Sequence, residues 1–265
     1  MKNLKLALIL FLGIILLSVA CEKDDNATVD VVKQLKKYTI DGEELLFTYD
    51  NNRISSIVYK QLGVIKYTEE YVYNGDKLLK RAIYDTNGLN TTLMFRNHNS
   101  YDLPTYAANY SESDNDTLPS TASLYAYNGN RLTEQKYIEY DYKQEWAYDY
   151  IFTYMNDNVI RDSIYFSIDT LVGESVITKS YEFDNMKNPG KDIGLFSDFR
   201  FNNNRFLNLI NKNNITMSKW IEPDGTVVPE ISFNLYYEYD ADNYPIKCTM
   251  ISFDNSMVTN IKYEY

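Results

Sequence analysis

The chain has 265 residues, with 26 Lys or Arg against 37 Asp or Glu, so its formal net charge is −11 at pH 7. An acidic protein repels phosphate backbones, which excludes nucleic acid as an expected partner. Only two cysteines and one histidine occur. This count excludes a disulfide scaffold and a zinc site with several His or Cys ligands, and we expect no metal and no cofactor.

Residues 1–20 have the pattern of an export signal. Two lysines precede an uncharged apolar run from Leu6 to Leu17. This run is shorter than the roughly 20 residues that a membrane-spanning helix needs. Small residues then lead to Cys21, a pattern typical of cleavage before a cysteine that receives acyl chains. The sequence therefore predicts a lipoprotein signal peptide over residues 1–20 and lipidation of Cys21.

Residues 21–32 form the expected tether between the lipid and a domain over residues 33–265. The sequence Glu22-Lys23-Asp24-Asp25 resembles the acidic surface-export tag of Bacteroidota lipoproteins. A solvated linker is the alternative interpretation. We expect an outer-membrane lipoprotein of the cell envelope that contacts the membrane through its lipid. Display at the cell surface is favoured over an inward-facing anchor.

A repeated pattern fills the domain. It consists of aromatic-x-aromatic, a short turn of Asn, Asp or Gly, and an apolar residue that opens the next run. Clear copies begin at Phe47, Tyr71, Tyr125, Phe152 and Tyr237, half a copy ends the chain at Tyr263, and weaker copies begin at Phe95, Tyr181 and Ile210. The mean spacing is about 27 residues, which suits a hairpin of two strands.

The pattern within each copy predicts strands joined by tight turns. From Tyr148 to Tyr154 every second residue is aromatic, and a period of two places these side chains on one face of a strand. Five of the ten glycines follow Asn or Asp, as tight hairpin turns require. The sequence therefore predicts an all-β fold, an antiparallel up-and-down meander. We expect it to be strongly curved or closed into a barrel-like sheet, because a long open sheet exposes its edges.

Charges on both faces of the expected strands argue against a barrel that spans a membrane. Lys66 and Glu70 share one face, and Glu69 lies on the other. A lipid-facing band must be apolar, and a basic residue at mid-bilayer costs about 2–4 kcal/mol. The ending at Tyr265 resembles the last strand of an outer-membrane barrel, but the charges favour a water-soluble domain tethered by lipid.

The repeats resemble a family of Bacteroidota lipoproteins described as having a porin-like fold. Further matching segments are Tyr181-Glu-Phe183-Asp184 with the break at Asn188-Pro189, then Asn213-Asn214-Ile215, and the ending from Tyr237 to Tyr265. The copies are also distantly similar to the YD repeats of secreted toxin shells, although the glycine usual after that turn is mostly missing. The resemblance implies fold and location, and no activity.

No catalytic constellation is recognisable in the sequence, so we expect a protein that is not an enzyme. His98 has only Ser100 as a nearby hydroxyl, and no serine lies in a nucleophile-elbow motif. A glycoside hydrolase remains a less favoured alternative, since 37 acids make carboxylate pairs inevitable. The loops at 114–116 and 240–243 are interpreted as Asx turns in preference to calcium sites, because neither has EF-hand spacing.

The expected function is a binding or adhesion module for a glycan or a protein. Trp146 and Trp220 are the candidate ligand-binding residues, since an indole can stack on a sugar ring; burial in the core is the alternative. A structural or accessory subunit of an outer-membrane assembly is the alternative function. Three Asp-Ser/Thr-apolar triplets resemble O-glycosylation acceptors, with acceptor residues Thr117, Ser163 and Thr170.

Overall fold

Strands make up most of the regular structure. The computed structural model describes residues 32–111, 119–141, 144–168, 171–191 and 211–265, so the predicted signal peptide and Cys21 lie outside the described residues. The strands of the described part are β1 Lys37–Ile40, β2 Glu43–Asp50, β3 Arg53–Gln61, β4 Val64–Asn74, β5 Lys77–Asp85, β6 Gly88–His98, β7 Pro104–Ser111, β8 Thr121–Asn128, β9 Arg131–Asp141, β10 Gln144–Met155, β11 Asn158–Ile168, β12 Leu171–Phe183, β13 Ile215–Ile221, β14 Phe233–Tyr239, β15 Pro245–Ser252 and β16 Val258–Glu264. A short 3₁₀ helix, η3, covers Pro229–Ile231.

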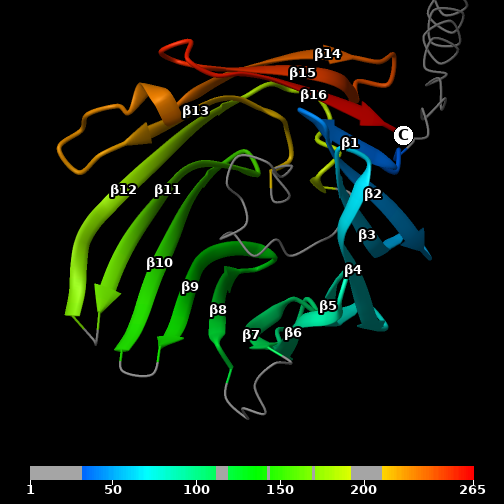
Figure 1. Ribbon diagram of the computed structural model, residues 1–265. Coiled ribbons are helices and arrows are strands. Elements are labelled where there is room, and N and C mark those ends of the chain that lie inside the picture. The colour runs from blue at the N-terminus through cyan, green and yellow to red at the C-terminus, as the bar shows by residue number, and fades with distance from the viewer. Residues whose placement is uncertain (1–31, 112–118, 142–143, 169–170, 192–210) are drawn as a thin grey trace, which may run out of the picture. The chain divides into compact units, whose positions relative to one another are not determined.

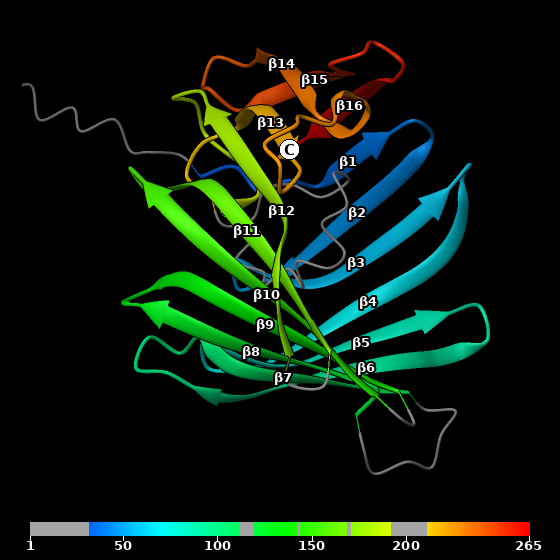
Figure 2. The same ribbon diagram turned by 90° about the vertical axis from the view of Figure 1, so that its left-hand side faces the viewer.

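The sixteen strands of the described residues form one closed antiparallel barrel. Each strand pairs with the next in the chain, as Figures 1 and 2 show from two sides. The barrel closes through β1, which pairs with β2 on one side and β16 on the other, with Lys37 opposite Glu264 and Ile40 opposite Ile261. The predicted all-β meander is therefore confirmed, and the sheet is closed. Closure removes the exposed edges that an open sheet would leave.

The aromatic repeat has a bulge beside most of the described turns at one end of the barrel. In the β2–β3 hairpin the register shifts between Thr48 and Tyr49, directly before the turn. Equivalent shifts precede Tyr73, Tyr127, Tyr154, Phe183 and Tyr239. The turn residues Asn51 and Asn52 have φ of 49° and 64°, which Asn tolerates better than most residues. Bulges bend strands and increase their twist, which helps a sheet to close.

The aromatic residues of the repeat lie on the inner face. Two clusters of buried side chains fill this face. One gathers β1–β3, β15 and β16 around Tyr38, Ile54 and Cys248, and the other gathers β5–β11 around Phe95, Tyr125 and Phe152. Half-buried tyrosines surround both clusters, and Tyr71 packs against each of them. Tyrosine suits this role because its ring is apolar and its hydroxyl can reach a polar partner.

In three copies of the repeat, the second aromatic residue ties its hairpin to the preceding one. Tyr49 donates to the carbonyl of Leu35 (2.8 Å), Tyr127 to that of Pro104 (2.7 Å) and Tyr265 to that of Pro245 (2.9 Å). Each acceptor occupies the apolar position that follows the preceding turn, or its equivalent before β1. These bonds explain why the position is so often Tyr. The end of the barrel that carries these turns, at 51–52, 75–76, 99–103, 129–130, 156–157 and 240–244, is termed the repeat rim below.

Ion pairs also connect successive turns of the repeat rim, and each runs from a basic residue to an acid of the following turn. Arg53 binds the carboxylate of Asp76 in the following turn, and Arg131 binds that of Asp157. Lys77 lies 3.3 Å from a carboxylate oxygen of Asp102. A basic residue after one turn therefore contacts an acid in the next turn. Exposed pairs of this kind contribute about 0–1 kcal/mol each, so they add little to the stability of the barrel.

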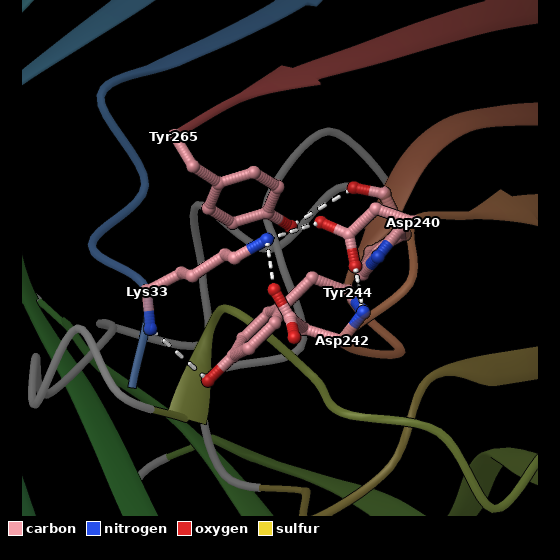
Figure 3. Close-up of polar contacts among 6 residues, drawn as sticks. Lys33, Asp240, Asp242, Tyr244 and Tyr265 are labelled. Atoms are coloured by element: carbon pink, nitrogen blue, oxygen red, sulfur yellow. Dashed lines mark hydrogen bonds and ion pairs between the residues drawn. The ribbon is translucent and has the colours of Figure 1, made fainter. Parts of the chain in front are cut away.

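Lys33 joins the start of the domain to its last turn (Figure 3). Its ammonium lies 2.8 Å from Asp240 Oδ2 and 2.6 Å from Asp242 Oδ2, and its main-chain N–H donates to the Tyr244 hydroxyl (3.2 Å). The hydrogen bonds to the two carboxylates raise the pKa of Lys33. The loop that was considered for calcium thus binds an ammonium group of the chain itself.

Candidate functional site

Among the described residues, buried carboxylates lie at two places on the inner wall. The first lies on β4 and β5, where the side chains of Glu69 and Arg81 are only 7% and 11% exposed. The second lies on β11, β12 and β13, where Asp162, Lys179 and Trp220 are neighbours across adjacent strands. Burial of a charge is costly unless the group is paired and hydrogen-bonded. The two places differ in how well this requirement is met.

Glu69 is fully engaged by its neighbours. Arg81 donates from Nη2 to Oε1 (2.7 Å) and from Nε to Oε2 (3.0 Å), which is the bidentate geometry that suits a carboxylate. The Tyr71 hydroxyl also donates to Oε2. Both oxygens therefore have donors, and we interpret this pair as part of the barrel's internal support.

Asp162 is less well satisfied. It lies opposite Phe152 of the inner cluster and is 5% exposed. Its Oδ2 accepts a hydrogen bond from the Tyr181 hydroxyl (3.0 Å), whereas its Oδ1 is buried and has no hydrogen-bond partner. An unpartnered buried acceptor costs about 1–3 kcal/mol, and more when it is charged. Such an atom is where a ligand donor would gain most.

Lys179 and Trp220 continue this row. The ammonium of Lys179 lies 4.4 Å from the centre of the Trp220 ring, a cation–π contact. Within the described part of the chain, Lys179 Nζ makes no hydrogen bond. The main-chain N–H of Trp220 donates to Ser232 Oγ (2.9 Å), which fixes β13 against the segment that leads into β14. Both side chains are half-buried, so neither is sealed in the core.

Burial governs the electrostatics of the row. It raises the pKa of the Asp162 carboxyl, while attraction to Lys179 and the Tyr181 hydrogen bond act in the opposite direction. It also lowers the pKa of the Lys179 ammonium, against the attraction of Asp162. Each charged form is therefore held at a cost that its neighbour only partly offsets. Perturbed groups of this kind concentrate at functional sites, although structural pairs produce them as well.

The two tryptophans of the predicted ligand site are not neighbours in the sheet. Trp220 belongs to the row on β11–β13. The backbone of Trp146 lies in β10 opposite Glu139 and Ile168, so β11 and β12 separate the two positions.

The predicted modification sites are placed only in part. Ser163 is half-buried in β11, where its backbone pairs with Ile151 and Thr178. Its neighbours Asp162 and Ile164 are buried, so Ser163 lies on the opposite face of the strand. Thr117, Thr170 and Cys21 lie outside the described residues.

The sequence did not indicate a binding site at Asp162, Lys179 and Tyr181. Asp162 appeared only as the first residue of a glycosylation triplet. A usable signal was present in the repeat, however. If the bulge after Thr153 is allowed for, the inward alternation of β10 carries over to β11 and places Asp162 opposite Phe152. The signal is a charged residue at an inward-facing position of this strand.

The cysteine and the histidine of the described residues lie on other strands than this row. Cys248 is buried in β15, and burial raises the pKa of its thiol to about 12. His98 Nε2 lies 2.9 Å from the carbonyl of Leu78. Among the described residues, no group of three or more His, Cys, Asp or Glu side chains is arranged to hold a metal ion. None of the helices in that part of the chain has the length and apolar composition needed to cross a bilayer.

The described residues thus define a β-barrel protein whose wall carries a buried charged and aromatic row on its inside. The fold is porin-like. A crystal structure of a porin-like protein from Bacteroides uniformis ATCC 8492 is similar, with a TM-score of 0.55 and 12% identity over 88% of this chain and 98% of that chain. One of a porin-like protein from Bacteroides vulgatus ATCC 8482 gives 0.52 and 15%, over 88% and 99%.

These similarities concern the fold alone. They confirm the porin-like resemblance of the repeats. A TM-score of 0.26 to TcdB2-TccC3-TEV, at 11% identity over 74% of this chain and 12% of that one, is too low to bear on the YD-repeat resemblance. No protein-family model matches the chain, and no curated protein matches it in sequence.

Proposed function

We propose that this protein is a lipid-anchored, surface-displayed component of the cell envelope whose barrel binds a ligand without transforming it. The export signal over residues 1–20 and the cysteine at position 21 support the anchor. The porin-like fold is consistent with an envelope location. The observation that carries the binding role is the row of Asp162, Lys179 and Trp220, where a buried oxygen lacks a donor beside an indole that is half-buried.

The barrel itself stands in water under this proposal. On β4, Lys66 and Glu70 are exposed on the face opposite Glu69. On β14 and β15, Glu238 and Lys247 form an exposed pair with an N–O distance of 2.7 Å. Because each basic residue at mid-bilayer would cost about 2–4 kcal/mol, such an outer face suits water better than lipid. The lipid on Cys21 would then be the contact with the membrane.

A binding role fits the row better than hydrolysis does. Glycosidases need two carboxyl groups facing each other across the substrate. Within the described residues, the groups that act on the Asp162 carboxyl are the Tyr181 hydroxyl, the Lys179 ammonium and the main-chain N–H groups of Lys179 and of Asp162 itself, and none of them is a second acid. We therefore propose, as we expected from the sequence, that the protein is not an enzyme.

The anchor is tested in intact cells. Wild type should incorporate a labelled fatty acid, should fractionate with the outer membrane, and should be cleaved by protease added outside. Cys21→Ala should lose the label and leave the membrane fraction, whereas Cys248→Ala should keep both properties. Label in Cys21→Ala, or protection of the wild type from external protease, would contradict the proposal.

The binding role is tested with the full-length protein purified in detergent. It is screened on a glycan array and against envelope extracts, in parallel with Trp220→Phe. We expect at least one ligand that binds wild type and binds the variant more weakly. No ligand in either screen would refute the proposal.

One observation favours the accessory-subunit alternative. At the end of the barrel opposite the repeat rim, Leu62, Met257 and Val258 are 83%, 45% and 56% exposed. Exposed apolar side chains that gather at one end suit contact with another protein. Photo-cross-linking from position 62 in intact cells tests this role. One cross-linked partner in fixed ratio would support it, and an uncross-linked monomer would reject it.

A further inference from the structure

We propose that the row of Asp162, Lys179 and Trp220 recognises a neutral sugar, with one hydroxyl group of the sugar bridging Asp162 Oδ1 and Lys179 Nζ. This inference rests on the proposed binding function and names the ligand class of the same site. It follows from what each of the three side chains lacks.

Asp162 lacks a donor. Its Oδ2 already accepts from Tyr181, and its Oδ1 accepts from nothing although it is buried. The comparable carboxylate on the inner wall, Glu69, has donors on both oxygens. The amide oxygens of Asn109 and Gln135 are buried without a partner as well, but they carry no charge. Of the two buried carboxylates described on the inner wall, Glu69 is satisfied on both oxygens and Asp162 on one. A ligand that offers an O–H or N–H group to this oxygen would remove an unfavourable desolvation.

Lys179 lacks an acceptor. Its ammonium rests on the Trp220 ring and is attracted by Asp162, but it makes no hydrogen bond within the described part of the chain. An ammonium has three donors to satisfy. A ligand atom with lone pairs beside Nζ would therefore be stabilised.

A hydroxyl group meets both needs at once, because it is one donor and two acceptor lone pairs on a single oxygen. A carboxylate or phosphate would suit Lys179 but would be repelled by Asp162. An ammonium group would suit Asp162 but would be repelled by Lys179. The opposite charges of the two residues on adjacent strands thus select against both ionic classes.

Trp220 adds the apolar part of the recognition. A sugar ring has C–H faces that pack on an indole and hydroxyl groups that leave the ring at its edge. Trp220 lies directly opposite Lys179 in the sheet, and the Lys179 ammonium lies over its ring. On binding, the sugar would take the place of the ammonium over the indole, and the ammonium would turn to the sugar's edge beside Asp162. Phe152, opposite Asp162 on the other side, extends the apolar surface of the row.

The test uses the full-length protein in detergent and measures binding by calorimetry and tryptophan fluorescence. The probes are neutral hexose oligosaccharides, oligogalacturonate and chitosan oligomers of matched length. We expect a neutral oligosaccharide to bind and the charged ones to bind at least about tenfold more weakly. Asp162→Asn and Lys179→Met should each weaken neutral-sugar binding about tenfold, the loss expected for one hydrogen bond in a closed site.

The matched control is Asp149→Asn. Asp149 also has a carboxylate oxygen without a hydrogen-bond partner, but its side chain lies on the other face of β10 from Tyr148 and Phe152. Its substitution should leave sugar binding unchanged. The inference is overturned if Asp162→Asn behaves like Asp149→Asn, or if a charged oligosaccharide binds best. If only a protein ligand binds wild type, the sugar inference falls and the binding function stands. If nothing binds, both fall.

Discussion

Replacement of Arg81 by Met should destabilise the barrel more than any change in the exposed charges. Arg81 makes two hydrogen bonds to Glu69, and both side chains are almost completely buried. Loss of one partner of a buried pair leaves an uncompensated charge and costs about 3–5 kcal/mol, whereas an exposed pair contributes about 0–1 kcal/mol. If Glu69 is replaced by Gln at the same time, the isolated charge disappears and much of the loss should be recovered.

The free energy of unfolding is measured by urea titration, with circular dichroism and tryptophan fluorescence monitored together to test for a single transition. Lys80→Met is the matched control, since Lys80 is the neighbouring basic residue on the other face of β5. It should change stability by less than about 0.5 kcal/mol. A loss below about 1 kcal/mol in Arg81→Met, or no recovery in the double variant, would refute the view of this pair as an internal support.

Four further outcomes are expected. Burial raises the folded-state pKa of Asp162, so the wild type should lose stability as pH rises from the ordinary pKa of Asp to this raised value, and Asp162→Asn should lack this loss. Tyr127→Phe removes the hydroxyl bond to Pro104 and should cost about 0.5–1.5 kcal/mol in urea titration. Leu62→Asn should stabilise by up to about 1 kcal/mol, since Leu62 has φ of 51°. The Cys248 thiol should react with a disulfide reagent only after unfolding.

A matched control keeps the Tyr127 outcome interpretable. Tyr236→Phe removes a hydroxyl from a side chain that is 59% exposed and should have little effect on stability. Rapid labelling of Cys248 in the native barrel would contradict its burial. A Leu62→Asn variant less stable than wild type would show that the exposed side chain contributes more than the backbone strain costs.

The sequence was informative about the fold because the repeat encodes it locally. Tyr148, Tyr150 and Phe152 alternate with a period of two, and turns such as Asn51-Asn52 have the residues that positive φ requires. Both signals depend on neighbouring residues, so they could be read without a structure. Closure could not be read in this way. It depends on the pairing of Ile40 with Ile261, and nothing local in either segment indicates its partner.

The inner row was harder to predict for a related reason. Asp162 and Lys179 belong to different hairpins, and their proximity depends on the register across β11 and β12. One bulge between Thr153 and Tyr154 changes which residues face inward, so a simple alternation assigns the wrong face. The tryptophans were candidates because of their residue type, and residue type does not indicate that Trp220 lies across the sheet from Lys179.

The bonds along the repeat rim bear on how the number of strands in such a barrel can change. Tyr49 and Tyr127 each donate a hydrogen bond to a carbonyl of the preceding hairpin. Arg53 and Arg131 each form an ion pair with an Asp of the following hairpin. Duplication of one internal hairpin would therefore create a new neighbour already equipped with both halves of each joint. The circumference can then grow or shrink by two strands at a time, while the ion pairs of Lys33 with Asp240 and Asp242 still join the first segment to the last turn.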